Sequence, residues 1–353
     1  MLTCKSPRKV MRVAHELACH VLPKYASRFS CQDFTLPQLF ACLVLREHQK
    51  KSYRGAEALL RDAPQWGRGI GMKRVPNHNT LCRAYGLLVR RHMNMNRILD
   101  LLAHWFQCAA VLGSTLAIDS TQYDTHYRSR HYEQRCRHYA CRSAATANAR
   151  RSRSAKRTPK LAVGVATACH LILAAKARLG MGSDGRDFVP VLRAAHRRHP
   201  SLRHALADAG YDSDANHRLT REKFHLHSWI QATAGRPGRR LPTSRYRRLM
   251  KRHLTGSQAG RLDGQRSPVE ATHSMMKRNL GEALRARRQE RRRLEQFLRV
   301  ITHNVMILFR VQSEGRDRAP TTRIAGIGRA QNPSNKNSIC GLRRPFTRSF
   351  SLS

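Results

Sequence analysis

The spacing of apolar residues predicts a helical region over the first 110 residues of the chain. One apolar stripe recurs at helical intervals at Val10, Val13, Leu17 and Val21. Thr35 and Ser52 are residue types that cap helices, and each precedes a segment with apolar residues on one helical face. Pro37, just after Thr35, favours the first turn of a helix. We therefore expect several short helices in this region.

The last helix of this region is expected from about Thr80 to Arg91. Residues 76–80, which begin with a proline, are expected to end the preceding helix and to cap this one. It has a polar, basic side, as does the helix that enters the major groove in helix-turn-helix proteins. On that interpretation Asn79, Thr80 and Arg83 are candidate DNA contacts. A helical bundle that serves only as a scaffold has the same spacing, so both interpretations stay open.

The pattern changes after Gly113 to short apolar runs alternating with helical segments. The runs predict strands over 115–118, two within 161–178, one over 202–207 and one over 228–232. The segments between them predict helices over 187–199 and 213–224. Helices return from Ser244 onward, the last over 286–311 with one apolar stripe. This order predicts an α/β fold, a mixed sheet flanked by helices.

Basic residues dominate the chain and cluster along it. The sequence has 67 Lys and Arg against 22 Asp and Glu, a formal net charge of +45. Such a charge attracts polyanions, and nucleic acid is the obvious partner because each phosphate contact releases a condensed counterion. One cluster, rich in Arg and Tyr, spans 123–160 and includes Arg128 and Arg130. We expect this insertion to line a DNA channel; a solvated insertion is the alternative.

The patterns divide the chain into three parts. We expect residues 1–110 to form a helical domain that binds DNA, and residues 111–311 to form the α/β domain that carries the basic insertion. Residues 312–353 are polar and rich in Pro, Ser, Asn and Arg, so we expect a disordered tail. The 41% hydrophobic content excludes a chain that is disordered throughout.

The cysteines and apolar segments exclude several other classes. Ten Cys lack the spacing of a disulfide framework, and we see neither a signal peptide nor a membrane-spanning segment. We therefore expect a cytoplasmic, nucleoid-associated protein. Five residues in the basic insertion have side chains that suit zinc, although their spacing matches no standard finger: His126, His131, Cys136, His138 and Cys141.

Two of the expected strands end on an aspartate, Asp119 and Asp208. A carboxylate at the end of an apolar strand is costly to desolvate unless a cation or hydrogen bonds compensate. Hard divalent cations prefer such oxygen ligands, and Mg²⁺ binds a few carboxylates together with substrate phosphate. Each aspartate alone would also suit an ordinary turn. Glu270 is a third candidate, although Ser267 and Pro268 before it equally suit a helix capping box.

In this order the motifs resemble those of the DDE transposases of bacterial insertion sequences, which belong to the retroviral-integrase, ribonuclease H-like superfamily. Leu116-Ala-Ile-Asp119-Ser-Thr resembles the first-aspartate strand, and Asp208-Ala-Gly-Tyr-Asp-Ser resembles the second-aspartate motif. Arg266, Glu270 and Lys277 have the spacing of the signature around the third carboxylate. Two N-terminal segments, starting at Phe34 and Val75, also resemble the family, so the likeness spans about residues 30–310.

The resemblance implies a ribonuclease H-like fold and roles for individual residues. Asp119, Asp208 and Glu270 would be the catalytic ligands of Mg²⁺ or Mn²⁺, and Arg266 and Lys277 would contact phosphates of the DNA. Arg287 and Arg291 join the candidate DNA contacts because the start of the last helix is rich in arginine. The family often has a Tyr three positions before the signature Arg, whereas this chain has Asp263.

The implied activity is that of a DNA transposase, which cleaves at transposon ends and transfers the new 3′-hydroxyl to target DNA. The implied partners are double-stranded terminal inverted repeats, target DNA and a second copy of the chain in a synaptic dimer. A non-catalytic or degenerate nucleic-acid-binding relative of the same fold is the alternative, because the positive charge alone supports it equally well.

Overall fold

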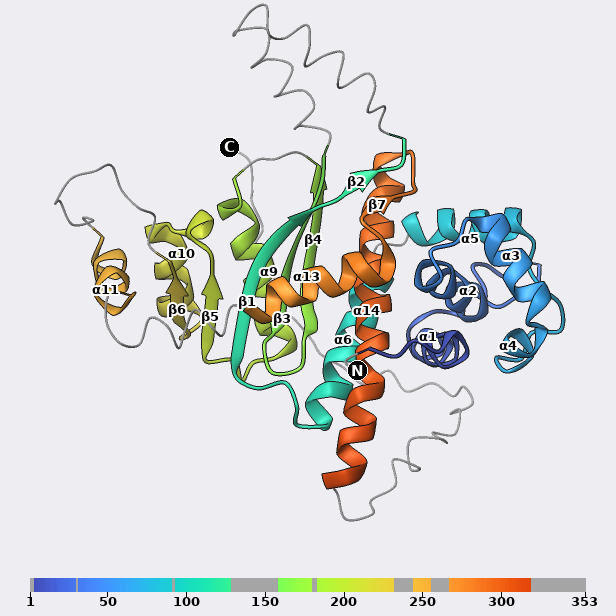
Figure 1. Ribbon diagram of the computed structural model, residues 1–353, viewed down its shortest axis with the longest axis horizontal. Coiled ribbons are helices and arrows are strands. Elements are labelled where there is room, and N and C mark those ends of the chain that lie inside the picture. Colours follow the sequence, from blue (N-terminus) through green and yellow to red (C-terminus); the bar gives the residue numbers. More distant parts are fainter. Residues whose placement is uncertain are drawn as a thin grey trace, which may run out of the picture.

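The computed structural model describes residues 3–29, 31–90, 93–127, 158–179, 183–231, 244–254 and 267–318. Helices at the N-terminal end lie on one side of a five-stranded sheet, and further helices cover the sheet (Figure 1). One buried apolar cluster runs through both the N-terminal helices and the sheet. Among the described residues, no helix is both long and apolar enough to cross a membrane.

The predicted N-terminal helices are present. They are α1 (Pro7–Val21), α2 (Leu36–His48), α3 (Tyr53–Asp62), α4 (Pro64–Arg68), α5 (His78–Arg90) and α6 (Met93–Cys108). Thr35 and Gln38 form a reciprocal capping box on α2, and Ser52 caps α3. Helix α5 begins at His78, two residues before the expected start, because the Asn77 side chain accepts from the Thr80 amide at 2.8 Å. The pattern analysis did not predict α4 or α6.

The predicted mixed sheet is confirmed. Its strand order is β4-β3-β1-β5-β6, with β1 antiparallel to β3, β3 antiparallel to β4, and β5 and β6 parallel to β1. The strands are β1 (Thr115–Gln122), β3 (Pro159–Ala166), β4 (Leu171–Leu179), β5 (His204–Ala207) and β6 (His227–Ile230). This order and these directions are those of a ribonuclease H-like fold. A separate parallel pair joins β2 (Asp124–Thr125) to β7 (Ala283–Leu284).

The expected end of the first strand was wrong. Strand β1 continues past Asp119 to Gln122, because Ser120, Thr121 and Gln122 keep their pairing with β3. The polar character of these three residues hid the strand from a pattern based on apolar runs. Strand β5, in contrast, ends at Ala207, directly before Asp208, as expected.

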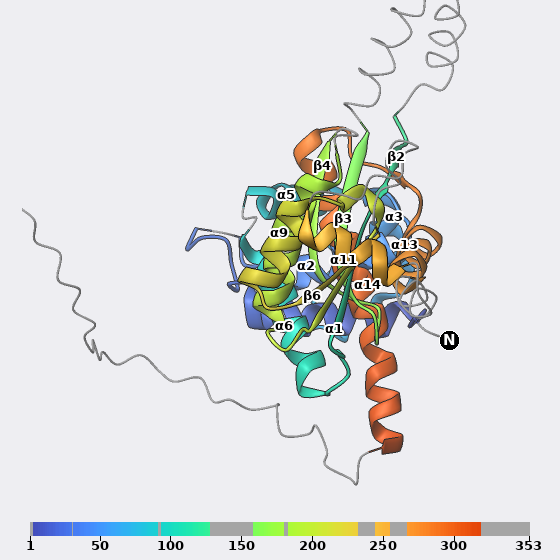
Figure 2. The same ribbon diagram turned by 90° about the vertical axis from the view of Figure 1, so that its left-hand side faces the viewer.

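Two helices cover opposite faces of the sheet (Figure 2). Helix α9 (Gly185–Arg198) packs closely on one face, where a Cβ added to Gly164 of β3 would lie 3.0 Å from the Val191 side chain. Helix α13 (Ser267–Leu280) crosses the other face, over β1 and β3. Because side chains alternate along a strand, Ser120 points toward the start of α9 and Asp119 points toward α13.

The segment between β5 and β6 is built of short helical turns. A 3₁₀ turn (Ala209–Tyr211) and α10 (Asp214–Arg218) follow β5, and a π-helical turn (Leu219–Lys223) continues α10 where the sequence predicted one helix over 213–224. Helix α11 (Arg245–Leu254) lies between β6 and α13 in the chain.

The last helix, α14 (Gln289–Arg318), runs along the edge strand β4 and extends seven residues beyond its expected end at 311. The Asn304 side chain accepts from the Ile172 amide at 3.0 Å and donates to the Ile172 carbonyl at 2.9 Å. The Asn304 side chain thereby satisfies both the amide and the carbonyl of Ile172, which face away from the sheet on the edge strand. The remainder of the expected tail, 319–353, lies outside the described residues.

A buried ionic network joins the N-terminal helices to α14. Glu47 of α2 accepts from Arg285 at 2.5 Å, and Glu295 of α14 accepts from the Arg285 and Ala286 amides. Arg299 donates to Glu295 at 3.0 Å and to the carbonyls that follow α13, those of Gly281 and Ala283. The side chains of Glu47, Glu295 and Arg299 are at most 1% exposed. Paired charges at this depth hold α2, α13 and α14 together.

We expect Glu47→Gln to lower the free energy of unfolding by about 3 kcal/mol or more, because it leaves buried arginines short of a counter-charge. Urea unfolding followed by circular dichroism measures this change. Glu290→Gln, at an exposed position at the start of α14, is the matched control and should cost less than about 1 kcal/mol. Equal costs for the two variants would contradict the assigned role of the network.

A second buried group makes stability depend on pH. His303 of α14 is fully buried against the β3–β4 turn, with Nε2 3.2 Å from the His170 carbonyl. Burial lowers the pKa of His303 to about 4, from an ordinary value of 6.5. The unfolded chain therefore binds more protons than the folded chain between these values, so this contribution is complete above pH 6.5 and is lost as the pH falls toward 4.

We expect His303→Gln to reduce the loss of stability between pH 7 and pH 5 by about 2 kcal/mol relative to the unaltered chain. The measurement is the free energy of unfolding in urea at both pH values, without divalent cations. The variant retains a pH dependence of the same sign from His273, whose pKa burial also lowers to about 4. If the free energy of unfolding falls by the same amount between pH 7 and pH 5 in the variant and in the unaltered chain, His303 is not neutral in the folded protein.

Candidate functional site

The candidate site is an open cavity between α13 and β1. Its volume is about 360 Å³. Strand β1 and helix α13 supply nearly all of its wall, and Glu282, just after α13, completes it. The lining residues are Asp119, Ser120, Thr121, Glu270, His273, Ser274, Lys277, Arg278 and Glu282.

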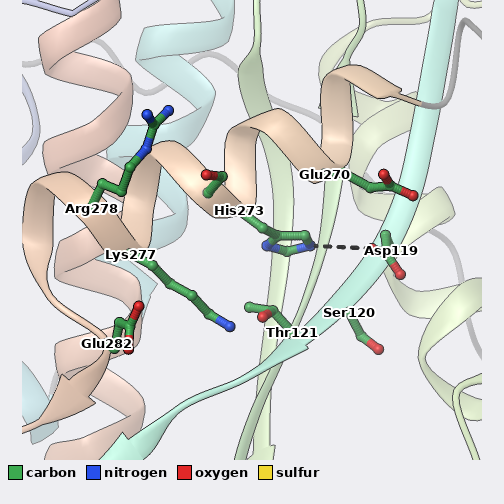
Figure 3. Close-up of a pocket in the computed structure, with 9 residues that line it drawn as sticks. Asp119, Ser120, Thr121, Glu270, His273, Lys277, Arg278 and Glu282 are labelled. Carbon is green, nitrogen blue, oxygen red and sulfur yellow. Dashed lines mark ion pairs between the residues drawn. The ribbon is translucent and has the colours of Figure 1, made fainter.

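Helical spacing explains the α13 wall. Glu270, His273, Ser274 and Lys277 stand three, four and seven residues apart, which places them on one helix face. Glu270 and Lys277 therefore share the cavity. Figure 3 shows Glu270 and Asp119 where α13 crosses β1, with the Lys277 amine extended toward Thr121.

The register of the sheet brings the two aspartates to adjacent strands. Ile118 of β1 pairs with Ala207 of β5 in a parallel ladder, so Asp119 and Asp208 occupy the next positions on both strands. Neighbouring strands lie about 4.8 Å apart. Asp208 is exposed and does not line the cavity, and its side chain accepts from the following amide, that of Ala209, at 2.7 Å. Asp119 and Glu270 thus share the cavity, and Asp208 lies beside it.

A neutral histidine lies next to Asp119. The Nε2 atom of His273 lies 3.7 Å from Oδ2 of Asp119, whose side chain is 29% exposed. Burial and, to a smaller extent, the positive charge of Lys277 lower the pKa of His273 to about 4. An imidazole that is neutral at pH 7 adds no positive charge beside the Asp119 carboxylate, which suits a cation in the cavity.

A second layer of polar contacts lies behind β1. Asp184, just before α9, accepts from Ser120 at 2.8 Å and forms an ion pair with the buried Lys160 of β3. Tyr211, three residues after Asp208, is buried nearby, and burial raises its pKa. The Asp184 contacts join the start of α9 to β3 and to the strand that carries Asp119.

The donor set of the cavity suits a hard divalent cation. Carboxylates are the ligands that Mg²⁺ and similar ions prefer, and such ions often keep water or substrate phosphate as their other ligands. Among the described residues, no three His, Cys, Asp or Glu side chains lie close enough together to hold a metal ion. Asp119 and Glu270 supply carboxylate oxygens to the cavity and Asp208 lies at the adjoining strand position, so the residues fit a site in which carboxylates and substrate phosphate together bind the cations.

The other described candidate DNA contacts lie on α5, on α14 and just before α14. On α5, Asn79 and Arg83 are exposed and Thr80 is half-buried. Arg287 is exposed, with its guanidinium 4.4 Å from the Tyr127 ring centre. Arg291 is half-buried and donates to Cys82 of α5 at 3.3 Å, so it also contributes to packing.

Several candidates fall outside the described residues: Arg128, Arg130, Asp263 and Arg266. So does most of the basic insertion, and with it His131, Cys136, His138 and Cys141 of the alternative zinc site. His126 is described and exposed.

The sequence reasoning missed part of the cavity wall. His273, Ser274 and Arg278 could have been found, because they lie three, four and eight residues after Glu270 on the same helix. Glu282 follows a turn at Gly281, whose φ of 98° ends the helical periodicity. No spacing rule reaches across that turn.

Comparison with known proteins assigns the family. The chain matches the family described as "Transposase DDE domain" over residues 112–305, more than half of its length. No curated protein matches it. Two solved structures show a weak likeness. The Mos1 mariner paired-end complex with Mn has 11% identity and a TM-score of 0.24, with 84% of this chain and 83% of that chain covered. A pre-cleavage Mos1 transpososome has 11% identity and a TM-score of 0.21, with 87% and 97% covered.

The matched residues contain the whole sheet, the cavity and all three acidic residues singled out from the sequence. The chain therefore belongs to the DDE transposases, enzymes that cleave DNA and transfer its strands with the help of divalent metal ions.

Proposed function

We propose that Asp119, Asp208 and Glu270 hold the divalent metal ions, Mg²⁺ or Mn²⁺, with which this transposase cleaves the ends of its element and joins them to target DNA. The observation that carries this proposal is the shared cavity of Asp119 and Glu270, with Asp208 at the adjoining register position of β5. Bound cations supply Lewis-acid activation of the attacking and leaving oxygens in such a displacement.

The chain's own residues would bind and orient the DNA. Lys277 would contact a phosphate oxygen as a point charge, seven residues from Glu270 on the same wall. Arg278 lies at the exposed rim and adds positive charge. Phosphoryl transfer of this kind requires positioning and charge stabilisation and no covalent intermediate with the protein. In the first displacement water would attack the phosphodiester and the 3′-oxygen of the element end would leave as a 3′-hydroxyl. That hydroxyl would then attack a target phosphodiester, from which the target's own 3′-oxygen would leave.

The substrates in this proposal are the terminal inverted repeats of the element and a target duplex. Two copies of the chain would hold two ends together, as coupled cleavage of both ends requires. Residues 1–110 would serve as the DNA-binding domain, with Asn79, Thr80 and Arg83 on α5 and Arg287 and Arg291 near α14 as contacts. Arg128, Arg130 and Arg266 belong to the same proposed set.

We expect Asp119→Asn to lower the rate of metal-dependent DNA cleavage about 1,000-fold or more, since it removes a charged metal ligand. The substrate is a duplex that spans the inverted repeat beside the coding sequence, and cleavage is followed on a sequencing gel. DNA affinity should change less than about threefold, because this carboxylate does not bind phosphate directly.

Asp124→Asn is the matched control, because Asp124 lies on β2 outside the cavity and only five residues away. It should cleave at the rate of the unaltered chain. Cleavage by Asp119→Asn at that same rate, in buffers freed of contaminating nuclease, would refute the assignment.

Base reading by α5 can be tested with variants of its exposed polar residues. If this helix reads base edges, Asn79→Ala and Arg83→Ala should each weaken binding to the inverted repeat about tenfold, and binding to a random duplex much less. Fluorescence anisotropy at fixed salt measures both affinities. Arg54→Ala, at an exposed arginine of α3, is the control. Equal weakening on both duplexes would favour backbone contact or a scaffold role over base reading.

A further inference from the structure

Helix α11 has a strongly basic surface that the proposed site does not use. Its ten residues, Arg245–Leu254, include five Arg and Lys and no acidic residue. The helix lies at the opposite end of the long axis from the N-terminal helices, with α13 and β1 between them (Figure 1). Figure 2 views the molecule from that end, and α11 lies in front of the sheet, whose edge strand on this side is β6.

The inner side of α11 is anchored by acidic groups of neighbouring elements. Arg247 donates to both carboxylate oxygens of the buried Asp212, at 3.0 and 2.7 Å. The Tyr246 hydroxyl donates to Glu222 at 3.1 Å, and Ser244 donates to Asp214. Asp212 lies four residues after Asp208, so α11 is tied to the segment that leaves the proposed site. A bidentate pair of this kind fixes orientation as well as distance.

The outer side of α11 presents three exposed arginines. Arg245, Arg248 and Arg252 stand three and four residues apart, so they share one face of the helix. That face is about 10 Å long, which is roughly the length occupied by three phosphates along one strand of a duplex. All three residues of this row are arginines, so the row presents cationic side chains along its length.

We propose that α11 binds the backbone of duplex DNA that lies beyond the cleaved bond, on the side away from the transposon end. This inference rests on the proposed function of the cavity. DNA that contacts the N-terminal helices and crosses the cavity next reaches the α11 end of the molecule. Before cleavage that duplex is the flanking donor DNA, and at strand transfer it is the target. Both have the same backbone chemistry, and neither requires recognition of bases.

A paired set of variants tests the proposal. Arg245→Gln/Arg252→Gln neutralises two exposed arginines two turns apart on α11. Arg186→Gln/Arg193→Gln does the same on α9, which covers the opposite face of the sheet from the cavity. Both double variants change the net charge equally and alter only exposed positions, so a difference between them reports location and not total charge.

The first arm compares two duplexes in the presence of Ca²⁺, by fluorescence anisotropy over a range of salt. One duplex stops at the cleaved end of the inverted repeat, and the other continues about 15 base pairs into flanking DNA. We expect the α11 variant to bind the longer duplex about tenfold more weakly, with a log affinity–log salt slope smaller by about 2. Its affinity for the shorter duplex, and both affinities of the α9 variant, should stay unchanged.

The second arm separates the target from the flank. The pre-cut duplex is joined to a plasmid in the presence of Mn²⁺, and the α11 variant should join it about tenfold more slowly at low plasmid concentration and recover at high concentration. A defect in the first arm alone assigns α11 to the flank, and a defect in the second alone assigns it to the target. Either result supports the proposal.

Unchanged affinities and joining in both arms would overturn the inference, and so would equal losses on both duplexes or equal losses in the α9 variant. The binding arm does not depend on chemistry at the cavity. Active cleavage by Asp119→Asn would therefore refute the proposed site while leaving the result for α11 readable, and the two failures are distinguishable.

Discussion

The parallel pairing of β1 with β5 is the constraint on which the site depends. Both strands are buried, and the pairing of Ile118 with Ala207 puts Asp119 next to the strand end at Asp208. Side chains alternate between the faces of a sheet, so a slip of one residue would turn Asp119 toward α9 and away from α13. Leu116, Ala117 and Ile118 are fully buried between α9 and α13, and a slip would place side chains of the wrong size against both helices. The geometry of the cavity therefore follows from packing of the core and not from contacts among the acidic residues themselves.

The chain uses its few carboxylates in two distinct environments. Glu47, Glu295 and Asp212 are buried, and each is bound by arginine at short distance. Burial of a charge is tolerable only with such a partner, so these groups stabilise the fold and cannot bind an external cation. Asp119, Asp208 and Glu270 keep contact with solvent at the cavity or beside it. Solvent access and a surplus of positive charge nearby suit groups that exchange water for a cation and a polyanion.

The spacing of apolar residues predicted most of the helices and strands. It failed where polar residues take up regular structure because they pair with residues distant in the sequence. The runs ending at Ile118 and Ala207 were recognisable because a buried strand must be apolar. The continuation of β1 through Gln122 was not, because β3 supplies its pairing. The cavity side of α13 followed from helical spacing, whereas the turned position of Asp208, bound to its own following amide, did not. The positions of residues within one helix or strand were thus predictable from the sequence. Positions that depend on how two elements pack or connect were not.

Helix α13 also connects the cavity mechanically to the N-terminal helices. Its first turn contacts the β3–β4 turn, where His170 lies 3.2 Å from the Pro268 carbonyl, and its end is held by Arg299 through the Gly281 carbonyl. Arg299 also lies beside Glu47 of α2. A buried ionic network has few alternative arrangements, because moving one charge leaves another without a partner. Displacement of α2 would therefore shift the helix that carries Glu270 and Lys277, and DNA held by the N-terminal helices would meet a cavity wall at a fixed position.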